Sequence, residues 1–405
     1  MRKSGSVRGD SAADLTLLTE SPGFRFDFAS YFSIVSRPAH HDGLCPCRTA
    51  PRFRVAATAA MVARMTMANR LKARAPWALP ALLIPLALWI LWSELGPIAR
   101  AAPPAPDRAV TISATALDGV GSQIGPFRLT GALALRSEDA GFGGLSGLAA
   151  AGEGRLVAVT DAGQWLTLTP QDVAGRLAGV GAARMAGVAS GAEKSDLDSE
   201  AIVLTPDGRT LISMEQRHRI LVLKGQAPPF QPEGLIFHTA AASWPPNGGG
   251  ESLALLPGGE TLWISEDARL APGVAMALLT AADGTTRQIG IPVPEHFAPT
   301  DVTVLDGQRL LLLHRKFDGV SVEAAITLVD LAPVLAGGDS ATMRPLVRWG
   351  RDAPWPIDNM EGLTLVRAGG RTMLFLVSDD NFNPAQRTLL LRLELVNPLD
   401  GAQSP

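Results

Sequence analysis

Cysteine is scarce in this chain of 405 residues, and the two that are present, Cys45 and Cys47, both lie within the first 50. The rest of the chain therefore cannot form a disulfide, and its fold must depend on a buried core. A domain of about 300 residues buries enough surface to fold without such cross-links. The spacing of the two cysteines is also too short for the usual Cys-x-x-Cys zinc knuckle, so we expect no zinc site there.

Histidine is scarce as well, which argues against the common transition-metal sites. Residues 102–405 contain four histidines, at positions 218, 238, 296 and 314, and none forms a His-x-His or His-x-x-x-His pair. The serine-hydrolase elbow is also missing, because Gly144-Leu145-Ser146-Gly147-Leu148 ends in leucine where the elbow has a second glycine. Helical patterns are confined to short turns at residues 170–177 and 331–335, so we predict an all-β fold.

Charge is divided unevenly along the chain. The first 101 residues hold 6 acidic and 13 basic side chains, a net charge of +7, whereas residues 102–405 hold 33 acidic and 23 basic ones, a net charge of −10. A net-acidic domain repels the phosphate backbone of nucleic acid, which we exclude as a partner. The same balance suits divalent cations.

The N-terminal region has the features of an export segment. Residues 1–64 show no apolar periodicity, and we expect either an over-extended gene model or a disordered tail. Residues 65–101 combine basic residues, an apolar run at 77–92 and a small-x-small sequence, which is the order of a signal peptide. Lengthened to residues 77–98, the run could instead remain as an anchor in the inner membrane. A Pro-rich linker at 102–109 follows, and we expect a periplasmic or secreted, monomeric domain beyond it.

A short phrase recurs five times between residues 140 and 365. Its key positions are 146, 200, 251, 301 and 361, so the steps are 54, 51, 50 and 60 residues. The clearest copies are Asp198-Ser199-Glu200-Ala201, Gly250-Glu251-Ser252-Leu253 and Asn359-Met360-Glu361-Gly362. A repeat of about 40–50 residues is the size of one four-stranded blade of a β-propeller.

Each repeat contains the pattern of a β-hairpin. After the key position, apolar residues such as Ile202 and Leu204 alternate with the period of a strand. A glycine turn such as Asp207-Gly208 follows, and then a second strand that ends in a polar cluster.

Five repeats predict a propeller of five blades over residues 110–397, with a tail at 398–405. A sixth blade could lie within residues 319–350 or among the N-terminal strands. The strand at 388–395 leaves the last blade without a fourth strand. We therefore expect an N-terminal strand to complete that blade and close the ring, which removes exposed sheet edges.

The hairpin geometry predicts a ring of carboxylates. In an antiparallel hairpin the start of the first strand lies beside the end of the second, so Glu200 should neighbour Glu215, and Glu251 should neighbour Glu266. Around a propeller, all these ends reach one mouth of the central channel. Two simpler interpretations compete: the carboxylates cap loop N–H groups, or they are solvated charges at sheet edges.

Such a ring suits Ca²⁺, which takes six to eight oxygen ligands. We expect ligands from the set Glu200, Glu215, Glu251, Glu266, Glu361 and Asp379. The candidate catalytic residues are Glu200, Glu251, Glu361 and His314. The candidate substrate-binding residues are Arg217, Arg315 and Lys316, because cations beside a metal would bind the oxygens of a phosphate ester. Alternatively, these cations neutralise the carboxylates as ion pairs.

Taken together, the phrases resemble the bacterial phytase-like family, whose members are described as having esterase-like activity of phytase type. The resemblance covers about residues 125–396 and includes Ser378-Asp379-Asp380-Asn381-Phe382. It implies an exported β-propeller related in architecture to calcium-dependent phytases.

Three functional hypotheses follow. The first is a Ca²⁺-assisted hydrolase that acts on a small anionic substrate, a phosphate or other ester. The second is a lactonase-like propeller in which one central Ca²⁺ polarises a lactone carbonyl. The third is a propeller of the cell envelope that binds a ligand or protein without turnover.

Overall fold

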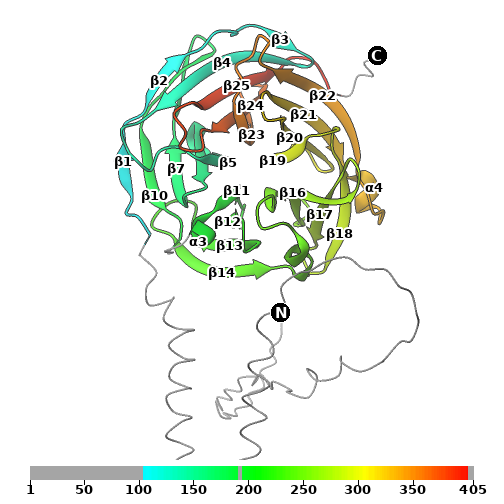
Figure 1. The fold of residues 1–405 in the computed structure, drawn as a ribbon. Helices are drawn as coiled ribbons and strands as arrows, with labels where there is room; N and C mark the ends of the chain where they lie inside the picture. Colours follow the sequence, from blue (N-terminus) through cyan, green and yellow to red (C-terminus); the bar gives the residue numbers. More distant parts are fainter. Residues whose placement is uncertain (1–103, 190–193, 400–405) are drawn as a thin grey trace, which may run out of the picture. The chain divides into compact units, whose positions relative to one another are not determined.

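The computed structural model describes residues 104–189 and 194–399, which form a β-propeller of five blades (Figure 1). The predicted fold class is confirmed. The segments expected to be a tail (1–64) and a signal peptide or anchor (65–101) lie outside the described residues, as does 400–405. No helix among the described residues has both the length and the apolar character needed to cross a membrane.

Each blade is an antiparallel sheet whose first strand lies nearest the central channel. The second, third and fourth blades have four strands each. In chain order these are β11 (Ser199–Leu204), β12 (Arg209–Met214), β13 (Arg219–Lys224) and β14 (Gln231–Phe237); β15 (Gly250–Leu255), β16 (Thr261–Ala271), β17 (Val274–Thr280) and β18 (Thr286–Pro292); and β19 (Ala298–Val304), β20 (Arg309–Phe317), β21 (Val322–Asp330) and β22 (Thr342–Gly350).

N-terminal strands extend the first and the last blade. The first blade contains, from the channel outward, β5 (Leu145–Ala151), β6 (Arg155–Thr160), β7 (Gln164–Leu168), β10 (Ala183–Gly187) and β1 (Arg108–Val110). The last blade contains β23 (Asn359–Ala368), β24 (Arg371–Asp379), β25 (Thr388–Leu395), β4 (Phe127–Arg136) and β2 (Ser113–Ala116), with β3 (Gln123–Ile124) beside β4.

The ring closes as the sequence predicts, because β4 supplies the fourth strand of the last blade. It pairs antiparallel with β25, from Leu135 opposite Thr388 to Phe127 opposite Leu395. The stretch 319–350, where a sixth blade was conceivable, contributes β21, the short helix α4 (Ala332–Leu335) and β22 to the fourth blade. The ring therefore has five blades, and the six-bladed alternative is wrong.

The remaining elements are small. The helix α3 (Lys194–Leu197) precedes β11, and 3-10 turns occur at Gly152–Gly154 and Thr239–Ser243. A separate hairpin of β8 (Pro170–Val173) and β9 (Arg176–Val180) replaces the helical turn expected at residues 170–177. The Asp172-Val173-Ala174-Gly175 sequence forms a turn there, with the Asp172 carboxylate accepting the N–H of Gly175 at 2.8 Å.

The core fills the spaces between adjacent blades. Alternate side chains of the inner strands face a neighbouring sheet, so these strands are covered on both sides and largely apolar, whereas the outer strand β14 is exposed throughout. Trp165, Trp263 and Trp349 are among the largest fully buried side chains. Full burial of a leucine or phenylalanine contributes about 1.5–3 kcal/mol each, which explains how the domain holds together without disulfides.

A β-bulge stands near the start of every innermost strand. The pairing register shifts by one residue at Ser146, Glu200, Glu251, Thr300 and Glu361. A bulge leaves one extra residue outside the ladder and redirects its side chain. The repeated phrase is thus the sequence of a bulge. In the fourth blade the bulged residue is Thr300, one residue before Asp301, the key position that the comparison of the internal repeats indicated.

Candidate functional site

Two sets of side chains meet at one mouth of the channel, and both follow from the bulges. We call the bulged residues the bulge ring: Ser146, Glu200, Glu251, Thr300 and Glu361. The second strand of each blade runs back to the same mouth. In the second blade, Ser199 pairs with Met214 beside the bulge, and Glu215 follows Met214; the other blades have an equivalent residue at this position. We call these residues the outer ring: Asp161, Glu215, Glu266, Arg315 and Asp379.

The carboxylates of the two rings are close enough for their charges to interact. Glu251 interacts electrostatically with Glu200, Glu266, Glu215 and Glu361. The five glutamates that the hairpin geometry placed at one mouth are therefore brought together. Asp379, also expected there, interacts with Asp161 and with Arg315.

Three carboxylates form the tightest group. Oxygen atoms of Asp198, Glu200 and Glu215 lie within 4.8 Å of one another. One oxygen of Glu215 accepts the N–H groups of Gly248 and Gly249, the latter at 3.1 Å. One oxygen of Asp198 accepts from the Gln216 amide at 2.6 Å, while its other oxygen, Oδ1, is buried without a hydrogen bond.

The local sequence explains how Glu215 reaches two backbone donors. Gly248 has a φ of +93°, a conformation that favours glycine, and a Cβ at Gly249 would meet the His218 ring at 2.4 Å. A side chain at either position would push the loop away from the carboxylate. The Gly248-Gly249-Gly250 run therefore serves close packing at the mouth.

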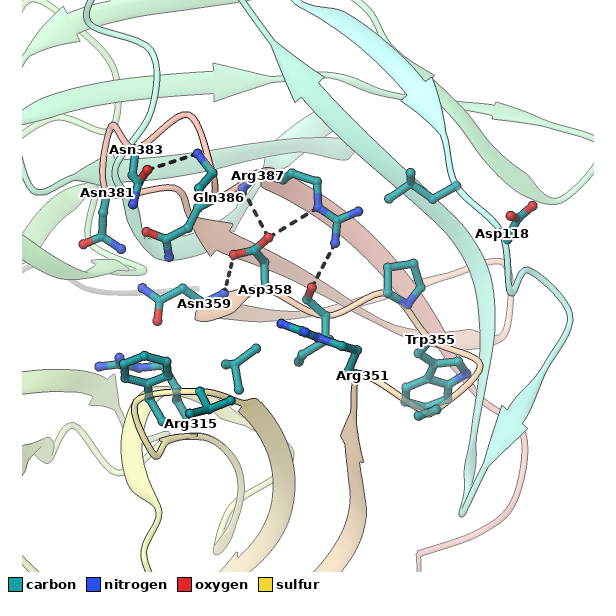
Figure 2. A pocket seen from close by; sticks show the side chains of 18 of the residues that line it. Asp118, Arg315, Arg351, Trp355, Asp358, Asn359, Asn381, Asn383, Gln386 and Arg387 are labelled. Atoms are coloured by element: carbon teal, nitrogen blue, oxygen red, sulfur yellow. Dashed lines mark hydrogen bonds and ion pairs between the residues drawn. The ribbon is translucent and has the colours of Figure 1, made fainter.

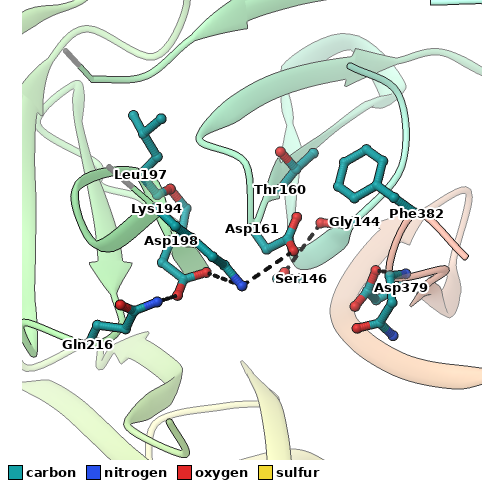
Figure 3. Close-up of polar contacts among 12 residues, drawn as sticks. Gly144, Ser146, Thr160, Asp161, Lys194, Leu197, Asp198, Gln216, Asp379 and Phe382 are labelled. Atoms are coloured by element: carbon teal, nitrogen blue, oxygen red, sulfur yellow. Dashed lines mark hydrogen bonds and ion pairs between the residues drawn. The ribbon is translucent and has the colours of Figure 1, made fainter. Parts of the chain in front are cut away.

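Lys194 reaches into this group from α3 (Figure 3). Its Nζ lies 3.4 Å from Oδ1 of Asp198 and 3.9 Å from Oδ2 of Asp161. The Lys194 side chain is 64% exposed, so it approaches the buried Asp198 from the solvent side. Its ammonium occupies the position where a cation would be attracted by these carboxylates.

Arg315 is the one cation of the outer ring, and it holds two glutamates. Its Nη2 donates to Oε1 of Glu266 at 2.7 Å, and its Nε lies 3.0 Å from Oε1 of Glu361. By contrast, none of the described residues donates a hydrogen bond to the side chain of Glu200 or Glu251. The mouth thus has a neutralised side at Arg315 and an acidic side at Glu200 and Glu251.

Crowding and burial shift the protonation of these groups. Burial, reinforced by the neighbouring Glu215, raises the pKa of Glu200 well above its usual value. Burial and the charge of Glu200 do the same for the pKa of Glu251. Burial raises the pKa of Glu361 to about 8, although Arg315 opposes the shift. Burial also raises the pKa of Asp379 to about 7, although the hydrogen bond from the N–H of Asn381 opposes the shift. The site therefore holds carboxyl groups that exchange protons near neutral pH.

Three sequence-predicted residues lie away from this group. His314 is fully buried, with Nε2 2.8 Å from Oγ1 of Thr327, and burial lowers its pKa to about 3. Its equivalents in the other blades are Thr160, Met214, Ser265 and Ser378, all buried, because the strand alternation turns this position into the core. Lys316 pairs with Glu323 at 3.0 Å, and Arg217 pairs with Asp196 at 2.6 Å.

Sequence reasoning omitted three residues of the site: Asp161, Asp198 and Lys194. A signal existed for the first two, since Asp161 follows the second strand of the first repeat and Asp198 begins the repeated phrase in the second. Lys194 carried no repeat signal, because α3 belongs to one inter-blade loop only.

Asp301, one residue past the bulge of the fourth blade, has a structural role. Its carboxylate accepts the N–H of Val302 at 2.8 Å and the N–H of Leu363 in the next blade at 2.7 Å. Thr300 donates its hydroxyl to the carbonyl of Met360 at 3.0 Å. These bonds tie the inner strands of the fourth and fifth blades together and fix the position of Glu361.

A pocket of about 810 Å³ opens beside Arg315 (Figure 2). It lies between the β20–β21 hairpin and the segments 351–359 and 381–387. A second cavity, of about 230 Å³, is lined by the inner strands beyond the bulges, with residues such as Leu148, Leu253 and Leu363. The channel is thus polar at the mouth and more apolar farther along its inner strands.

The comparisons with known proteins identify a family. Residues 140–382 match the family model named Phytase-like, which is described as "Esterase-like activity of phytase". No curated protein matches the chain.

Similar solved structures include the PQQ-bound aldose sugar dehydrogenase of Streptomyces coelicolor, with 15% identity, coverage of 72% of this chain and 100% of that one, and a TM-score of 0.35. The endo-arabinase of Bacteroides thetaiotaomicron has 13% identity, coverage of 64% and 96%, and a TM-score of 0.41. Similarity at this level has no bearing on substrate or reaction.

Proposed function

The chain belongs to the phytase-like family, and we propose that it is a Ca²⁺-assisted hydrolase of a phosphate or other ester. The observation that carries this proposal is the group of Asp198, Glu200 and Glu215, whose oxygens lie within 4.8 Å of one another at the mouth of the channel. Three ionised carboxylates at that distance repel one another, so the group must either take up a proton or share a cation.

The residues present fit calcium. All three donors are hard oxygen ligands, and Oδ1 of Asp198 is buried, with the exposed Lys194 ammonium 3.4 Å away as a cation that calcium would displace. Glu251, whose carboxylate interacts with Glu200 and Glu215, accepts no hydrogen bond from the described residues and could complete the set together with water. When bound, Ca²⁺ would supply positive charge that polarises an ester or phosphoryl oxygen.

The remaining chemistry belongs to the protein's own groups. Glu361 has a pKa of about 8, so it carries a proton at neutral pH and is suited to give it to the oxygen of a leaving alcohol. Asp379, with a pKa of about 7, is suited to take a proton from water. Arg315 holds the carboxyl group of Glu361 in position and adds positive charge beside it.

A substrate screen with a metal control tests this function. The purified protein would be incubated in about 1 mM CaCl₂ or in EDTA. The substrates are 4-nitrophenyl phosphate, 4-nitrophenyl acetate and δ-valerolactone, each at about 1 mM, which is near the upper end of typical KM values. We expect hydrolysis of one of the two esters, with a loss of at least about tenfold in EDTA and in Glu361→Gln. Hydrolysis of the lactone alone would support the lactonase hypothesis instead.

One observation favours a second candidate, a propeller that binds a ligand without turnover. Arg315 already contacts Glu266 and Glu361, and Lys194 lies against Asp198 and Asp161. If these ion pairs satisfy the carboxylates, no metal is required. Failure to hydrolyse any of the three compounds, with and without calcium, would move this candidate ahead.

We also infer that the propeller acts outside the cytoplasm, in the periplasm or secreted, with residues 65–101 as signal or anchor. The basic, apolar and small residues in that order support this inference. A fusion after residue 110 to alkaline phosphatase, which is active only when exported, should be active. An inactive fusion that accumulates in the cytoplasm would contradict it.

A further inference from the structure

The pocket beside Arg315 contains more than the mouth chemistry requires (Figure 2). Arg315 and Asn359 line the pocket and also contact residues of the channel mouth. Arg315 contacts Glu361, and the Asn359 amide donates to Asp379 at 3.5 Å. A substrate whose reacting bond lies at the mouth would therefore extend its other part into this pocket. The residues that line the pocket should then determine which substrates bind, through their contacts with the part of the substrate that does not react.

Three arginines line the pocket, and they differ in their partners. Arg315 is paired with two glutamates, and Arg387 donates to the carbonyl of Ile357 at 3.0 Å and lies 3.4 Å from Asp358. Arg351 is exposed, and none of the described residues hydrogen-bonds or ion-pairs with it. Figure 2 shows its side chain extending toward Arg315 and Asn359. Its guanidinium is therefore available to an anion in the pocket.

The opposite wall offers neutral polar groups on a well-held loop. The side-chain amides of Asn381 and Gln386 have no hydrogen-bond partner among the described residues. The loop that carries them is closed by its own bonds, from the N–H of Asn383 to the carbonyl of Asp380 at 2.7 Å and from the N–H of Gln386 to the carbonyl of Asn383 at 2.9 Å. The backbone that carries these amides is therefore held in place before any ligand arrives, and the amides themselves are available to it.

An apolar edge completes the pocket. Phe317 and Val320, at the end of the β20–β21 hairpin, are 65% and 84% exposed, and both line the pocket. The tip is not loose, because the Asp318 carboxylate accepts the N–H groups of Val320 and Ser321 at 3.0 and 2.8 Å. The hairpin thus presents an apolar surface next to the arginines.

We propose that this pocket binds the alcohol part of the ester, and that this part carries an anionic group of its own and one apolar face. Arg351 binds the anion, a carboxylate or a phosphate. Asn381 and Gln386 hydrogen-bond to its polar substituents, and Phe317 and Val320 pack against its apolar face. This inference rests on the proposed function, because it assumes that the mouth holds the reacting bond.

A matched pair of non-hydrolysable ligands tests the inference without requiring turnover. Benzylphosphonate and 4-carboxybenzylphosphonate differ by one carboxylate, and their binding to the purified protein in CaCl₂ would be measured by titration calorimetry. We expect the carboxylated ligand to bind about tenfold more tightly, the effect of one charge-assisted guanidinium pair. Arg351→Gln should abolish this difference, whereas Arg371→Gln, an exposed arginine at the β23–β24 turn, should preserve it.

The outcomes separate this inference from the hydrolase proposal. If Arg351→Gln removes the tenfold preference but no ester is hydrolysed, the pocket assignment stands and the hydrolase proposal fails. Equal affinity of the two phosphonates for the unsubstituted protein, binding of neither, or equal effects of the two arginine substitutions would overturn the pocket assignment. Because Arg351 has no partner in the described protein, its substitution should leave the melting temperature unchanged.

Discussion

Arg315 and Glu361 meet between neighbouring blades, with Nε of Arg315 3.0 Å from Oε1 of Glu361. Arg315 comes from the outer ring of the fourth blade, and Glu361 is the bulged residue of the fifth. This single cation stands among the carboxylates of both rings, so most of their negative charge remains uncompensated by the pair. The charge and the burial of these carboxylates together should determine how stability depends on pH and how the site binds calcium.

Glu361 should make the protein less stable as pH rises. Its pKa is about 8 in the folded protein against 4.5 for the ordinary group, so the folded state binds the proton more tightly. Its contribution to stability is complete below pH 4.5 and is lost as the pH rises through 8. The largest effect is about 4–5 kcal/mol, at about 1.4 kcal/mol for each unit of pKa difference.

Glu361→Gln isolates this contribution, because glutamine copies the protonated form. In chelator, the variant should equal the unsubstituted protein in urea unfolding at pH 4.5 and should be the more stable of the two at pH 8. Glu233→Gln, on the exposed strand β14, should show no such divergence. A variant that is less stable at pH 8 than the unsubstituted protein would show that Glu361 is ionised and held by Arg315.

Lys194 should compete with calcium. Its ammonium lies 3.4 Å from Asp198 and 3.9 Å from Asp161, and two charges at about 4 Å interact by roughly 1 kcal/mol even in water. Lys194→Gln removes this competitor and should tighten calcium binding by about fivefold in a calorimetric titration. Lys224→Gln, at an exposed position of β13, serves as the control. Unchanged or weaker binding in Lys194→Gln would mean that the cation does not bind beside Asp198.

Arg392 should stabilise the propeller by holding the β8–β9 hairpin. It is 3% exposed, and it donates to Asp172 at 2.6 Å and to the carbonyl of Gly175 at 2.7 Å. Arg392→Leu removes the buried guanidinium and its hydrogen bonds to Asp172 and Gly175. We expect the free energy of unfolding in urea to fall by about 3 kcal/mol. Asp172→Asn should also cost stability, because it leaves the buried Arg392 guanidinium without its counter-charge. A change within about 0.5 kcal/mol for Arg392→Leu would contradict this role.

Much of the fold could be predicted because each blade repeats the same hairpin. The period indicated five blades, and the unpaired strand at 388–395 indicated closure by an N-terminal strand, as β4 provides. The exact position of the bulge could not be predicted in every repeat, because the bulged residue varies, from Glu200 to Ser146 and Thr300. The fourth repeat was therefore aligned on Asp301, the residue with a charge, when Thr300 holds the bulged position.

The same one-residue uncertainty affected the site. In the fourth repeat, the sequence alone does not decide which of His314, Arg315 and Lys316 is equivalent to Glu215. Only the register shows that Arg315 is the equivalent residue and that His314, one position earlier, turns into the core. Lys194 and the Arg351 pocket depend on loops that occur once, and a repeat pattern carries no information about such loops.

Thermal unfolding in calcium and in chelator tests the central claim most directly, namely that the carboxylates at the mouth bind a cation. Calcium at a hundred times its dissociation constant should raise the free energy of unfolding by about 2.7 kcal/mol and raise the melting temperature accordingly. Glu200→Gln should lose most of this gain, because Glu200 belongs to the tightest carboxylate group, whereas Glu233→Gln should keep it. Identical melting of the unsubstituted protein in calcium and in chelator would contradict the claim and leave the two rings as an ion-pair network.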